Sequence, residues 1–505
     1  MTRFWMTHAA VAAGLTLSAP ALADVTAQEV WQNYKATTAD MGVDMTAVEK
    51  STTSGLEVRD IVMRLELSED EGRVRIEVPE LTFTDSGDGT VEVTLPEVMP
   101  IDVTMHPADD EVDTVEITLE HAHTGFSTVV SGSPEAMKYS YSAAESEARV
   151  TRVVVDDEPM DVGRAMVRME ALAGVSEVVR GAMRRYDQAV TVDVVSYDFD
   201  ITAPEGETGQ AKLAGKLSEL SYDSEWRVPE GPDYRDDMAA ALNAGLSMGG
   251  TLSYGAGESS FSVDAEGEHS EGTSRSDGGA LEFALSRDGL AYGLSARNVA
   301  VEIASSEAPF PIAVSFDELG VDLEMPVSAS EEPQDIGLKL LLSGLAVPEQ
   351  VWAMVDPGGR LPRDPAMLRL DLGASGILAE DVMDAEEMED LDSPPGELRN
   401  ARVNALELSA AGVELTGDGA FTFDNSDLDT FDGMPRPEGK LSLRLTGAHA
   451  LLDKLVEMGM VPEDQVSGMR MMLGLFAKPA GDDVLTSDIE VTPDGKVLAN
   501  GERLK

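Results

Sequence analysis

The chain of 505 residues contains no cysteine. Without thiols it cannot form disulfide bonds or thiolate zinc sites, and it lacks the modified cysteine that anchors a bacterial lipoprotein. The fold must therefore rest on its hydrophobic core, and a chain of this length can bury a sufficient one. Aromatic residues are also few, at 5%, whereas 25 methionines are available to fill an irregular core.

Positive charge is scarce as well. The sequence has 37 lysines and arginines against 94 aspartates and glutamates, a net charge of −57. Such a charge repels nucleic acid and anionic membrane surfaces, so both are excluded as partners. A solvated acidic surface needs no function, and the charge alone does not indicate a cationic partner.

No apolar segment beyond the N-terminus approaches the roughly 20 residues that span a bilayer. At the N-terminus, Arg3 precedes the apolar segment 9–19, and a proline and a small-x-small run ending at Ala23 follow. These features predict a signal peptide over 1–23, with cleavage between Ala23 and Asp24. A buried N-terminal helix is the alternative. We expect a periplasmic protein with no transmembrane anchor after cleavage.

Apolar and polar residues alternate with a period of two through most of the chain. In segment 63–67, for example, methionine and leucines alternate with arginine and glutamate. This pattern predicts half-buried antiparallel strands, linked by Asp/Gly turns such as 85–89. The predicted strands lie at 63–67, 74–78, 91–95, 115–119, 190–201, 213–222, 250–254, 261–265, 281–285, 299–303, 314–323, 403–408, 413–423, 441–445, 484–491 and 497–499. One more strand is predicted to end near residue 345.

Helical spacing occurs in fewer places. Thr26 and Glu29 have the spacing of a capping box and predict a helix over 26–36. Further helices are predicted at 160–186, 234–246, 451–460 and 462–476. The segment 160–186 combines apolar residues with five arginines. It is predicted to pack on the sheet with its arginines paired to acidic neighbours, and a membrane-surface or partner helix is the alternative.

The predicted fold is mainly β with a few helices, a β-rich α+β chain. Its extended antiparallel, hairpin-linked sheets are either packed as a sandwich or curved into a groove. Five regions are predicted: a signal peptide (1–23), an N-terminal β-meander with flanking helices (24–186), a central antiparallel β region (187–345), a loop-rich acidic connection (346–400), and a C-terminal β region with two helices (401–505).

Ser247 stands in a G-x-S-x-G pattern, which in serine hydrolases joins a strand to a following helix. Here a predicted helix precedes it and a strand follows, so the glycines are expected to end that helix. His269 and His449 are the available bases downstream, and neither has the context of a catalytic triad. A catalytic role for Ser247 is therefore the less favoured interpretation.

His121 and His123 would share one face of a strand, a spacing that can hold zinc. Glu120 would point the other way and no third ligand is identifiable, so two surface histidines are expected. The segment 424–433 resembles a calcium loop but has Phe431 where an oxygen ligand is needed. The segment 380–392 has eight acidic residues among thirteen, and it is expected to be a solvated loop, with loose calcium binding left open.

Several runs of the sequence resemble domain-of-unknown-function family 2125, exported proteins of Gram-negative bacteria. They occur throughout the chain, at 21–31, 352–366, 421–424, 431–437, 451–456, 470–474 and 494–504. The family implies no catalytic residues. The β-rich character is also similar to AsmA-like envelope proteins, whose long curved sheets handle lipids, although many of those keep an N-terminal membrane anchor.

Three classes of function remain open. The first is a non-enzymatic structural or interaction protein of the cell envelope, with a lipid or another envelope protein as partner. The second is a carrier of lipid or another apolar ligand in a β-sheet groove, and the third is a hydrolase. No catalytic residue, cofactor or metal site is predicted. The predicted helices are too few to cover every apolar strand face; in a groove, Met469, Met471 and Met472 are expected as adaptable lining.

Overall fold

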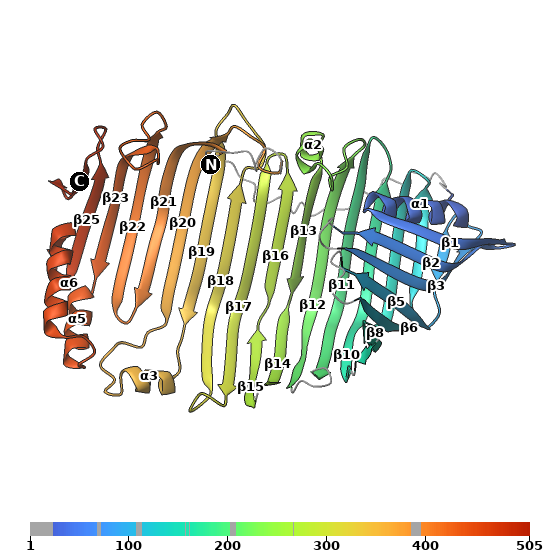
Figure 1. Ribbon diagram of the computed structural model, residues 1–505, viewed down its shortest axis with the longest axis horizontal. Coiled ribbons are helices and arrows are strands. Elements are labelled where there is room, and N and C mark those ends of the chain that lie inside the picture. Colours follow the sequence, from blue (N-terminus) through green and yellow to red (C-terminus); the bar gives the residue numbers. More distant parts are fainter. Residues whose placement is uncertain are drawn as a thin grey trace, which may run out of the picture.

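The structure is a computed structural model that describes residues 24–67, 72–107, 114–156, 158–160, 162–202, 209–265, 267–384 and 395–504. The signal peptide predicted over 1–23 lies outside the described residues. The described protein is mainly β, which confirms the predicted class. Its strands join into one large antiparallel sheet that runs along the long axis of the molecule (Figure 1).

The N-terminal part of the sheet follows a first helix. Its elements are α1 (Ala27–Asp40), β1 (Val43–Thr52), β2 (Gly55–Glu66), β3 (Arg73–Asp85), β4 (Val91–Thr94), β5 (Val98–His106), β6 (Val115–Thr124), β7 (Ser127–Ser133), β8 (Ala136–Val155), β9 (Glu158–Met160) and β10 (Arg164–Val179). The strands pair in the order β1, β2, β3, β5, β6, β8 and β10, and the short strands β4 and β7 continue the sheet between β3 and β8.

The central part contains the longest strands. Its elements are β11 (Met183–Thr202), β12 (Gly209–Pro229), α2 (Met238–Asn243), β13 (Ser247–Tyr254), β14 (Ala256–Ala265), β15 (Glu268–Ser276), β16 (Gly279–Ser286), β17 (Gly289–Ser305), β18 (Ile312–Met325) and β19 (Gln334–Leu345). β13 and β14 lie end to end beside β12, and β16 and β15 lie end to end beside β17.

The C-terminal part continues the sheet strand by strand. Its elements are α3 (Glu349–Val355), β20 (Ala366–Leu378), β21 (Gly396–Ala410), β22 (Val413–Asp424), β23 (Arg436–Thr446), α5 (Ala448–Glu457), α6 (Glu463–Phe476), β24 (Lys478–Gly481), β25 (Val484–Val491), β26 (Val497–Ala499) and β27 (Glu502–Arg503). Helices α5 and α6 lie at the C-terminal end of the sheet (Figure 1).

A compact core closes the N-terminal end. Val30 and Trp31 of α1 are fully buried against Val58 of β2, Val130 of β7 and Met137 of β8. Thr26 and Glu29 form the predicted capping box that begins α1. Strands β1–β3 therefore lie across α1 from β8, so the sheet is rolled into two facing layers here. The predicted sandwich exists at this end of the molecule.

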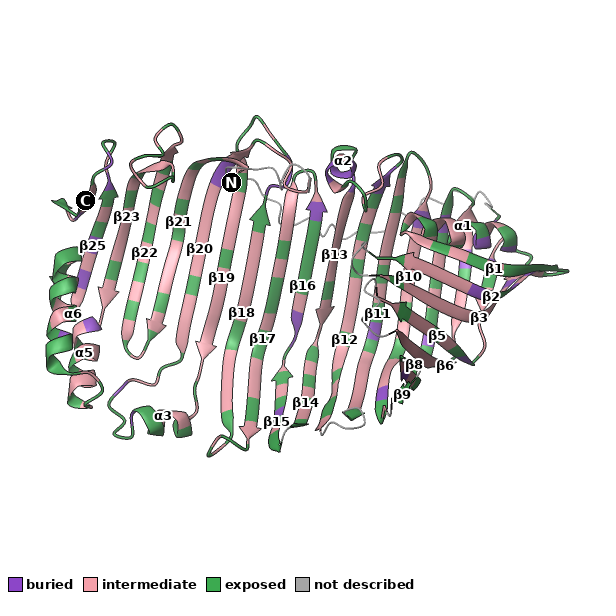
Figure 2. Cartoon of the chain, viewed as in Figure 1, coloured by how far each residue is buried: buried purple, intermediate pink, exposed green. Residues whose placement is uncertain are grey.

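The rest of the sheet is a single layer. Strands β17, β18, β19, β21, β22 and β23 contain no buried residue along their whole length. Figure 2 shows the same pattern, with fully buried residues gathered at the N-terminal end and along the edges. Among the residues that the structure describes, no second sheet covers these strands, so the predicted groove describes this part of the molecule.

Neighbouring strands bend along a line that crosses the sheet. At each bend, one pair of opposite residues is left out of the strand pairing. The pairing of β11 with β12 passes from Val192–Leu220 to Val194–Ser218 with unchanged register. The residues on this line that have left-handed backbone dihedrals are Gly125, Ala171, Glu219, Gly278, Asn298 and Gly344, and we call them the bend line. Each bend shifts the alternation of side chains by one position, so apolar residues stay on the same face on both sides.

The bend line explains why the predicted helix at 160–186 is wrong. This segment forms β10 and the start of β11. Its apolar spacing of three, from Met169 to Leu172, arises because Ala171 bends the strand between them, and a spacing of three is also the mark of a helix. The predicted pairing of its arginines is confirmed, as in Arg168 with Glu147 and Arg185 with Asp187.

Two further differences concern the segment 346–400 and the helix predicted at 234–246. We expected the segment 346–400 to be loop-rich. It contains α3, which has no buried residue, and β20, which is paired with β19 and β21. The helix predicted at 234–246 is present but short, since α2 covers only Met238–Asn243. The helices predicted at 26–36, 451–460 and 462–476 are confirmed as α1, α5 and α6. The boundaries of the five regions stay a prediction.

Candidate functional site: an apolar trough

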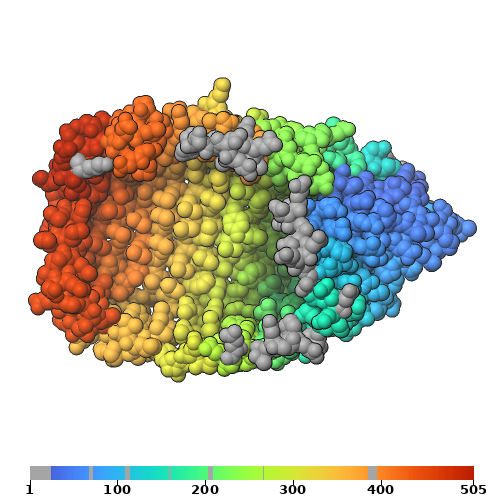
Figure 3. All heavy atoms as spheres, in the orientation of Figure 1, coloured from blue at the N-terminus to red at the C-terminus, as the bar shows by residue number. Residues whose placement is uncertain are grey.

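One face of the sheet, which we call the inner face, carries α1 and α2. Tyr139 of β8 donates a hydrogen bond to Asn33 Oδ1 of α1 at 2.9 Å, and Leu242 of α2 packs against Val228 and Leu285. In the view of Figure 1 this face is turned toward the reader, and Figure 3 shows it hollowed along its middle, between an upper and a lower edge.

Register places a continuous apolar strip on the inner face. Residues directly opposite one another in an antiparallel pair point to the same side. The row through Leu252 therefore continues through Leu281, Leu294 and Val321 to Leu340 and onward through Leu370 to Leu406. We call the inner face from β11 to β25 the inner trough. Twelve strands lie side by side here, which gives the inner trough a length of about 50 Å at the usual strand spacing.

The apolar side chains of the inner trough are open to solvent. Twelve large ones have exposed fractions between 36% and 45%. They are Ile201, Leu213, Leu252, Val263, Leu281, Phe283, Tyr292, Leu294, Ile303, Ile312, Met325 and Leu408. Together they form more contiguous apolar surface than the few hundred Å², roughly, that a soluble monomer ordinarily exposes. Such a surface is typical of a binding site.

Charged side chains are absent from the described floor of the inner trough. Among the described charged residues outside the bend line, only Arg184 and Glu268 have side chains that the register places on the inner face. Each of them lies at a strand end. The opposite, outer face carries the charges in cross-strand pairs, such as Lys216 with Glu258 at 2.8 Å and Lys440 with Asp488 at 3.2 Å. The sheet is thus apolar on one face and charged on the other.

Aromatic rings lie flat over glycines at several places on the floor. A Cβ at Gly215 would come within 2.5 Å of the Tyr197 hydroxyl oxygen, and one at Gly279 within 2.8 Å of the Tyr254 ring. Beyond the trough, Tyr141 of β8 lies over Gly174 of β10 in the same way. Because glycine leaves room for the ring, the floor stays smooth and the strands can curve closely around it.

A small band of hydroxyl groups interrupts the apolar surface. Ser259 of β14 and Ser274 of β15 share a hydrogen bond of 2.7 Å, and Tyr254 and Ser276 share one of 3.1 Å. A Cβ at Gly257 would touch Leu217, Ser276 and Tyr254 together, which places these three side chains on one face. These four hydroxyls lie beside the bend line, near the middle of the central strands.

The rims and ends of the inner trough are built differently. At one rim, α2 and the segment with Val382 and Met383 cover the ends of β12, β13 and β16. At the N-terminal end, Asp40 of α1 forms ion pairs with both Arg180 and Arg184. At the other end lie α5 and α6.

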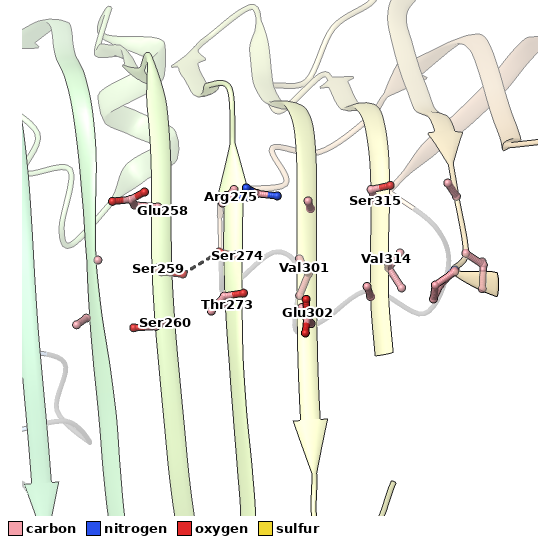
Figure 4. A pocket seen from close by; sticks show the side chains of 17 residues that line it. Glu258, Ser259, Ser260, Thr273, Ser274, Arg275, Val301, Glu302, Val314 and Ser315 are labelled. Atoms are coloured by element: carbon pink, nitrogen blue, oxygen red, sulfur yellow. Dashed lines mark hydrogen bonds between the residues drawn. The ribbon is translucent and has the colours of Figure 1, made fainter. Parts of the chain in front are cut away.

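A separate hollow lies on the outer face. It has a volume of about 850 Å³, and its floor is the backbone of the strands at Ser259 and Ser274. Glu258, Arg275 and Glu302 stand around it, as Figure 4 shows. The charges are mixed and widely spread over neighbouring strands, so this hollow offers no reactive constellation.

Ser247 lies where the sequence predicted, after a helix and at the start of a strand. The left-handed Gly245 follows the end of α2, as expected of a glycine that ends a helix. Ser247 pairs with Arg227 on β12, whereas Asp264, the partner of His269, pairs with Gln210. These β12 positions are 17 residues apart (227 − 210), on the order of 55 Å along the strand. His449 lies in α5, at the C-terminal end. The structure does not bring these residues together.

His121 and His123 point to the inner face, side by side, with ring centroids 5.8 Å apart. We expected them at the surface, but both are half-buried, and the Nδ1 atom of each is buried without a hydrogen-bond partner. Burial, with a smaller effect of His123, lowers the pKa of His121. Glu120 pairs with Arg149 on the outer face. Within the described residues, no three side chains of the ligand types form a metal site.

The segment 424–433 is organised by an arginine. Arg436 binds Asp424 at 2.6 Å and Asp427 at 2.8 Å, and the backbone amide of Thr430 donates to Asp427. Hydrogen bonds from Ser426, followed by Arg436, hold the pKa of Asp424 below its usual value. These carboxylates therefore act as an anchor for Arg436, which accounts for the acidic character of the loop.

The remaining predicted residues are placed as follows. Most of the acidic segment 380–392, namely residues 385–392, lies outside the described part of the chain. In its first five residues, Asp381 accepts hydrogen bonds from the Ala329 amide at 2.6 Å and from Asn243 of α2 at 2.8 Å. The cleavage position at Ala23 also lies outside, and Asp24 is the first described residue.

The predicted methionine lining is not part of the trough floor. Met469, Met471 and Met472 lie on α6, with exposed fractions of 45%, 68% and 54%. The floor is lined mainly by leucines instead. The sequence signal for it was the leucine alternation in segments such as 336–342 and 368–372, which the period of two marks as one-sided.

In the part of the chain that the structure describes, none of the helices is both long enough and apolar enough to cross a membrane. Comparisons with curated proteins and with solved structures gave no match. Residues 250–501 match the sequence model of a bacterial family described as "Uncharacterized protein conserved in bacteria (DUF2125)". The match covers the inner trough from β13 to β25, together with α3, α5 and α6. The chain therefore belongs to the DUF2125 family.

Proposed function

We propose that this protein is an exported, non-enzymatic carrier that shields the acyl chains of a lipid in the inner trough. The observation that supports this is the set of twelve half-exposed apolar side chains on the inner face, where the described charged residues lie only at strand ends or on the bend line. Water at such a surface is displaced favourably by hydrocarbon, at about 0.8 kcal/mol for each methylene buried. The charged outer face would keep the loaded protein in solution.

The dimensions of the inner trough suit acyl chains. One chain spans half of the ~30 Å hydrocarbon core of a bilayer, whereas the trough is about 50 Å long. A chain laid along the trough would contact one leucine after another, since each row runs across the strands and therefore along the trough. Binding would require no pocket of fixed shape, which agrees with the open form of the face.

Export is part of the proposal because of the N-terminal sequence pattern. We expect the intact mass of protein isolated from its host to begin at Asp24. A mass that retains residues 1–23 would contradict export, and it would leave the carrier proposal to be judged by ligand binding alone.

The test of the carrier proposal is direct. Protein purified without detergent is extracted with organic solvent, and the extract is analysed by mass spectrometry. We expect co-purified lipid in amounts comparable to the protein, and binding of the neutral dye Nile red with increased fluorescence. Absence of lipid together with absence of dye binding would contradict the proposal.

A second candidate is an interaction protein of the envelope, and the surface of α6 favours it. Met471, Met472 and Leu475 have exposed fractions of 68%, 54% and 59%, and they share one side of the helix. They lie on a helix at the C-terminal end of the sheet and are not part of its floor. In this case Met471→Ser with Leu475→Ser would abolish binding to a partner protein and leave Nile red binding unchanged.

A further inference from the structure

We propose that the ligand of the inner trough is a lipid with an uncharged polar group, of the glyceride or ester class, and that this group lies at the hydroxyl band of Tyr254, Ser259, Ser274 and Ser276. The inference rests on the carrier function proposed above. It concerns which lipids are accepted.

The distribution of charge in the inner trough disfavours an anionic head group. A carboxylate or phosphate brought into the trough would lose water and meet no cation, because Arg184 stands at a strand end and is already paired with Asp40. It would also enter the field of a protein whose net charge is −57. Both effects oppose an anionic head group and leave a neutral one unaffected.

A cationic head group is disfavoured for a related reason. Away from the bend line, the described floor carries no inward carboxylate apart from Glu268 at a hairpin end, so an ammonium group lying on the leucine rows would be desolvated without a partner. The long-range field would attract it to the outer face, where the acidic residues lie. A neutral polar group is thus the class that the floor accepts without a desolvated charge.

The hydroxyl band can form hydrogen bonds with an uncharged polar group. Each hydroxyl can donate one hydrogen bond and accept others. In the Ser259–Ser274 pair one hydroxyl donates to the other, so one O–H remains free to donate to a ligand. An ester carbonyl or a glycerol hydroxyl fits such a group, as neither requires a full charge.

The surroundings of the band assign a direction to the chain. On β14, Phe261 and Val263 follow Ser259 toward the hairpin, and across the bend line Leu252 and Leu281 begin the leucine rows. The rows run from β16 to β21, away from the N-terminal core, and continue on β23 beyond Gly417 and Gly419 of β22. An acyl chain attached to a polar group at the band would extend along them toward the C-terminal end.

The experiment compares three probes with the same acyl chain by displacement of Nile red: monoolein, oleate and oleylammonium, at pH 8 and below their critical micelle concentrations. We expect monoolein to displace the dye at a concentration lower than either charged probe by about tenfold or more. Equal or tighter binding of oleate would overturn the inference and leave the carrier function standing. No displacement by any probe, with no dye binding, would contradict the carrier function itself.

Two variants make the test specific. Leu281→Lys places one cation on the floor and should improve oleate binding about tenfold, whereas the outer-face neighbour Glu282→Lys, which changes the net charge by more, should not. Ser259→Ala combined with Ser274→Ala should weaken monoolein binding and leave methyl oleate displacement less affected, with Ser260→Ala on the outer face as control. Equal oleate binding in the two lysine variants would show that the floor does not select by charge.

Discussion

The ring of Tyr197 on β11 lies over Gly215 on β12, the residue directly opposite it. A Cβ at position 215 would approach both the Tyr197 hydroxyl oxygen and the backbone oxygen of Glu258 to 2.5 Å. The same arrangement recurs at Gly174 and Gly279, always on the inner face. The curvature of the trough therefore depends on glycines that a periodicity analysis counts only as gaps in a strand.

Gly215→Ala is predicted to lower the free energy of unfolding by about 1–3 kcal/mol, because the methyl group must displace a packed ring or a backbone strand. Urea denaturation followed by circular dichroism would measure it. Gly320→Ala on β18 is the control, since its Cβ would meet only Leu341 at 3.6 Å. Equal effects of the two substitutions would show that the ring–glycine contact is not responsible.

The bend line supplies a second prediction. Ala171 has a φ of 53°, a conformation that β-branched residues adopt poorly. Ala171→Val should therefore destabilise the protein by about 1–2 kcal/mol. Ala173→Val, two residues along the same strand and also exposed, should be neutral or stabilising because valine favours strands. An unchanged free energy of unfolding in Ala171→Val would indicate that the bend is not fixed by this residue.

The same bends define what the sequence could and could not predict. Alternation located most of the strands from 190 to 345 and from 403 to 499, because each has one wet and one apolar face. It missed β15, whose inner positions after Glu268 are serines and a glycine. It failed at 160–186, where the phase jump at Ala171 produces a helical spacing. It also could not decide between sandwich and groove, since that depends on which strands face each other after the sheet has rolled.

The candidate site shows the same division. The idea of an apolar groove followed from counting helices against strand faces. The lining residues did not follow, because the inner positions change parity at every bend, from odd numbers at Leu213 to even numbers at Leu220 on β12. The methionines stood out by composition, whereas the leucines that form the floor are common and become a site only through register.

The ion-pair cluster at Asp40 supplies a third prediction. Its carboxylate serves Arg180 at 2.9 Å and also Arg184, and Tyr186 donates a hydrogen bond to it. Asp40→Ala would leave two half-buried arginines without their anion, at a cost of about 3 kcal/mol. Asp44→Ala, at an exposed position of β1, should change the free energy of unfolding little. Comparable losses would argue against a special role of the cluster.

The pKa values of two histidines should be shifted in opposite directions. Burial lowers the pKa of His121, whereas a hydrogen bond to Asp264 raises the pKa of His269. With a depressed folded pKa, His121 makes the protein lose stability as the pH falls below about 6.5, because the unfolded chain binds the proton first. His269 acts in reverse, and its contribution is lost as the pH rises through its folded value.

Imidazole titration by nuclear magnetic resonance would measure both values. His121→Gln should remove the destabilisation below neutral pH, and Asp264→Asn should return the pKa of His269 toward its ordinary value. A pKa of His121 at or above that of a free histidine would contradict its burial on the inner face.

The last prediction separates the inner face from the outer one with two neighbouring residues. Leu294 faces the trough on β17 and is 37% exposed, and Ser295 beside it is exposed on the outer face. Leu294→Asp should lower the free energy of unfolding by no more than about 1.5 kcal/mol, because the side chain is only partly buried in the empty protein. It should nevertheless abolish most Nile red binding, since a charge would then lie in the middle of the apolar rows. Ser295→Asp adds the same charge to the same strand and should leave dye binding and the free energy of unfolding unchanged. Dye binding is measured by fluorescence titration and unfolding by urea denaturation. Loss of dye binding in both variants would mean that net charge alone controls it, and retention in both would place the dye elsewhere than in the inner trough.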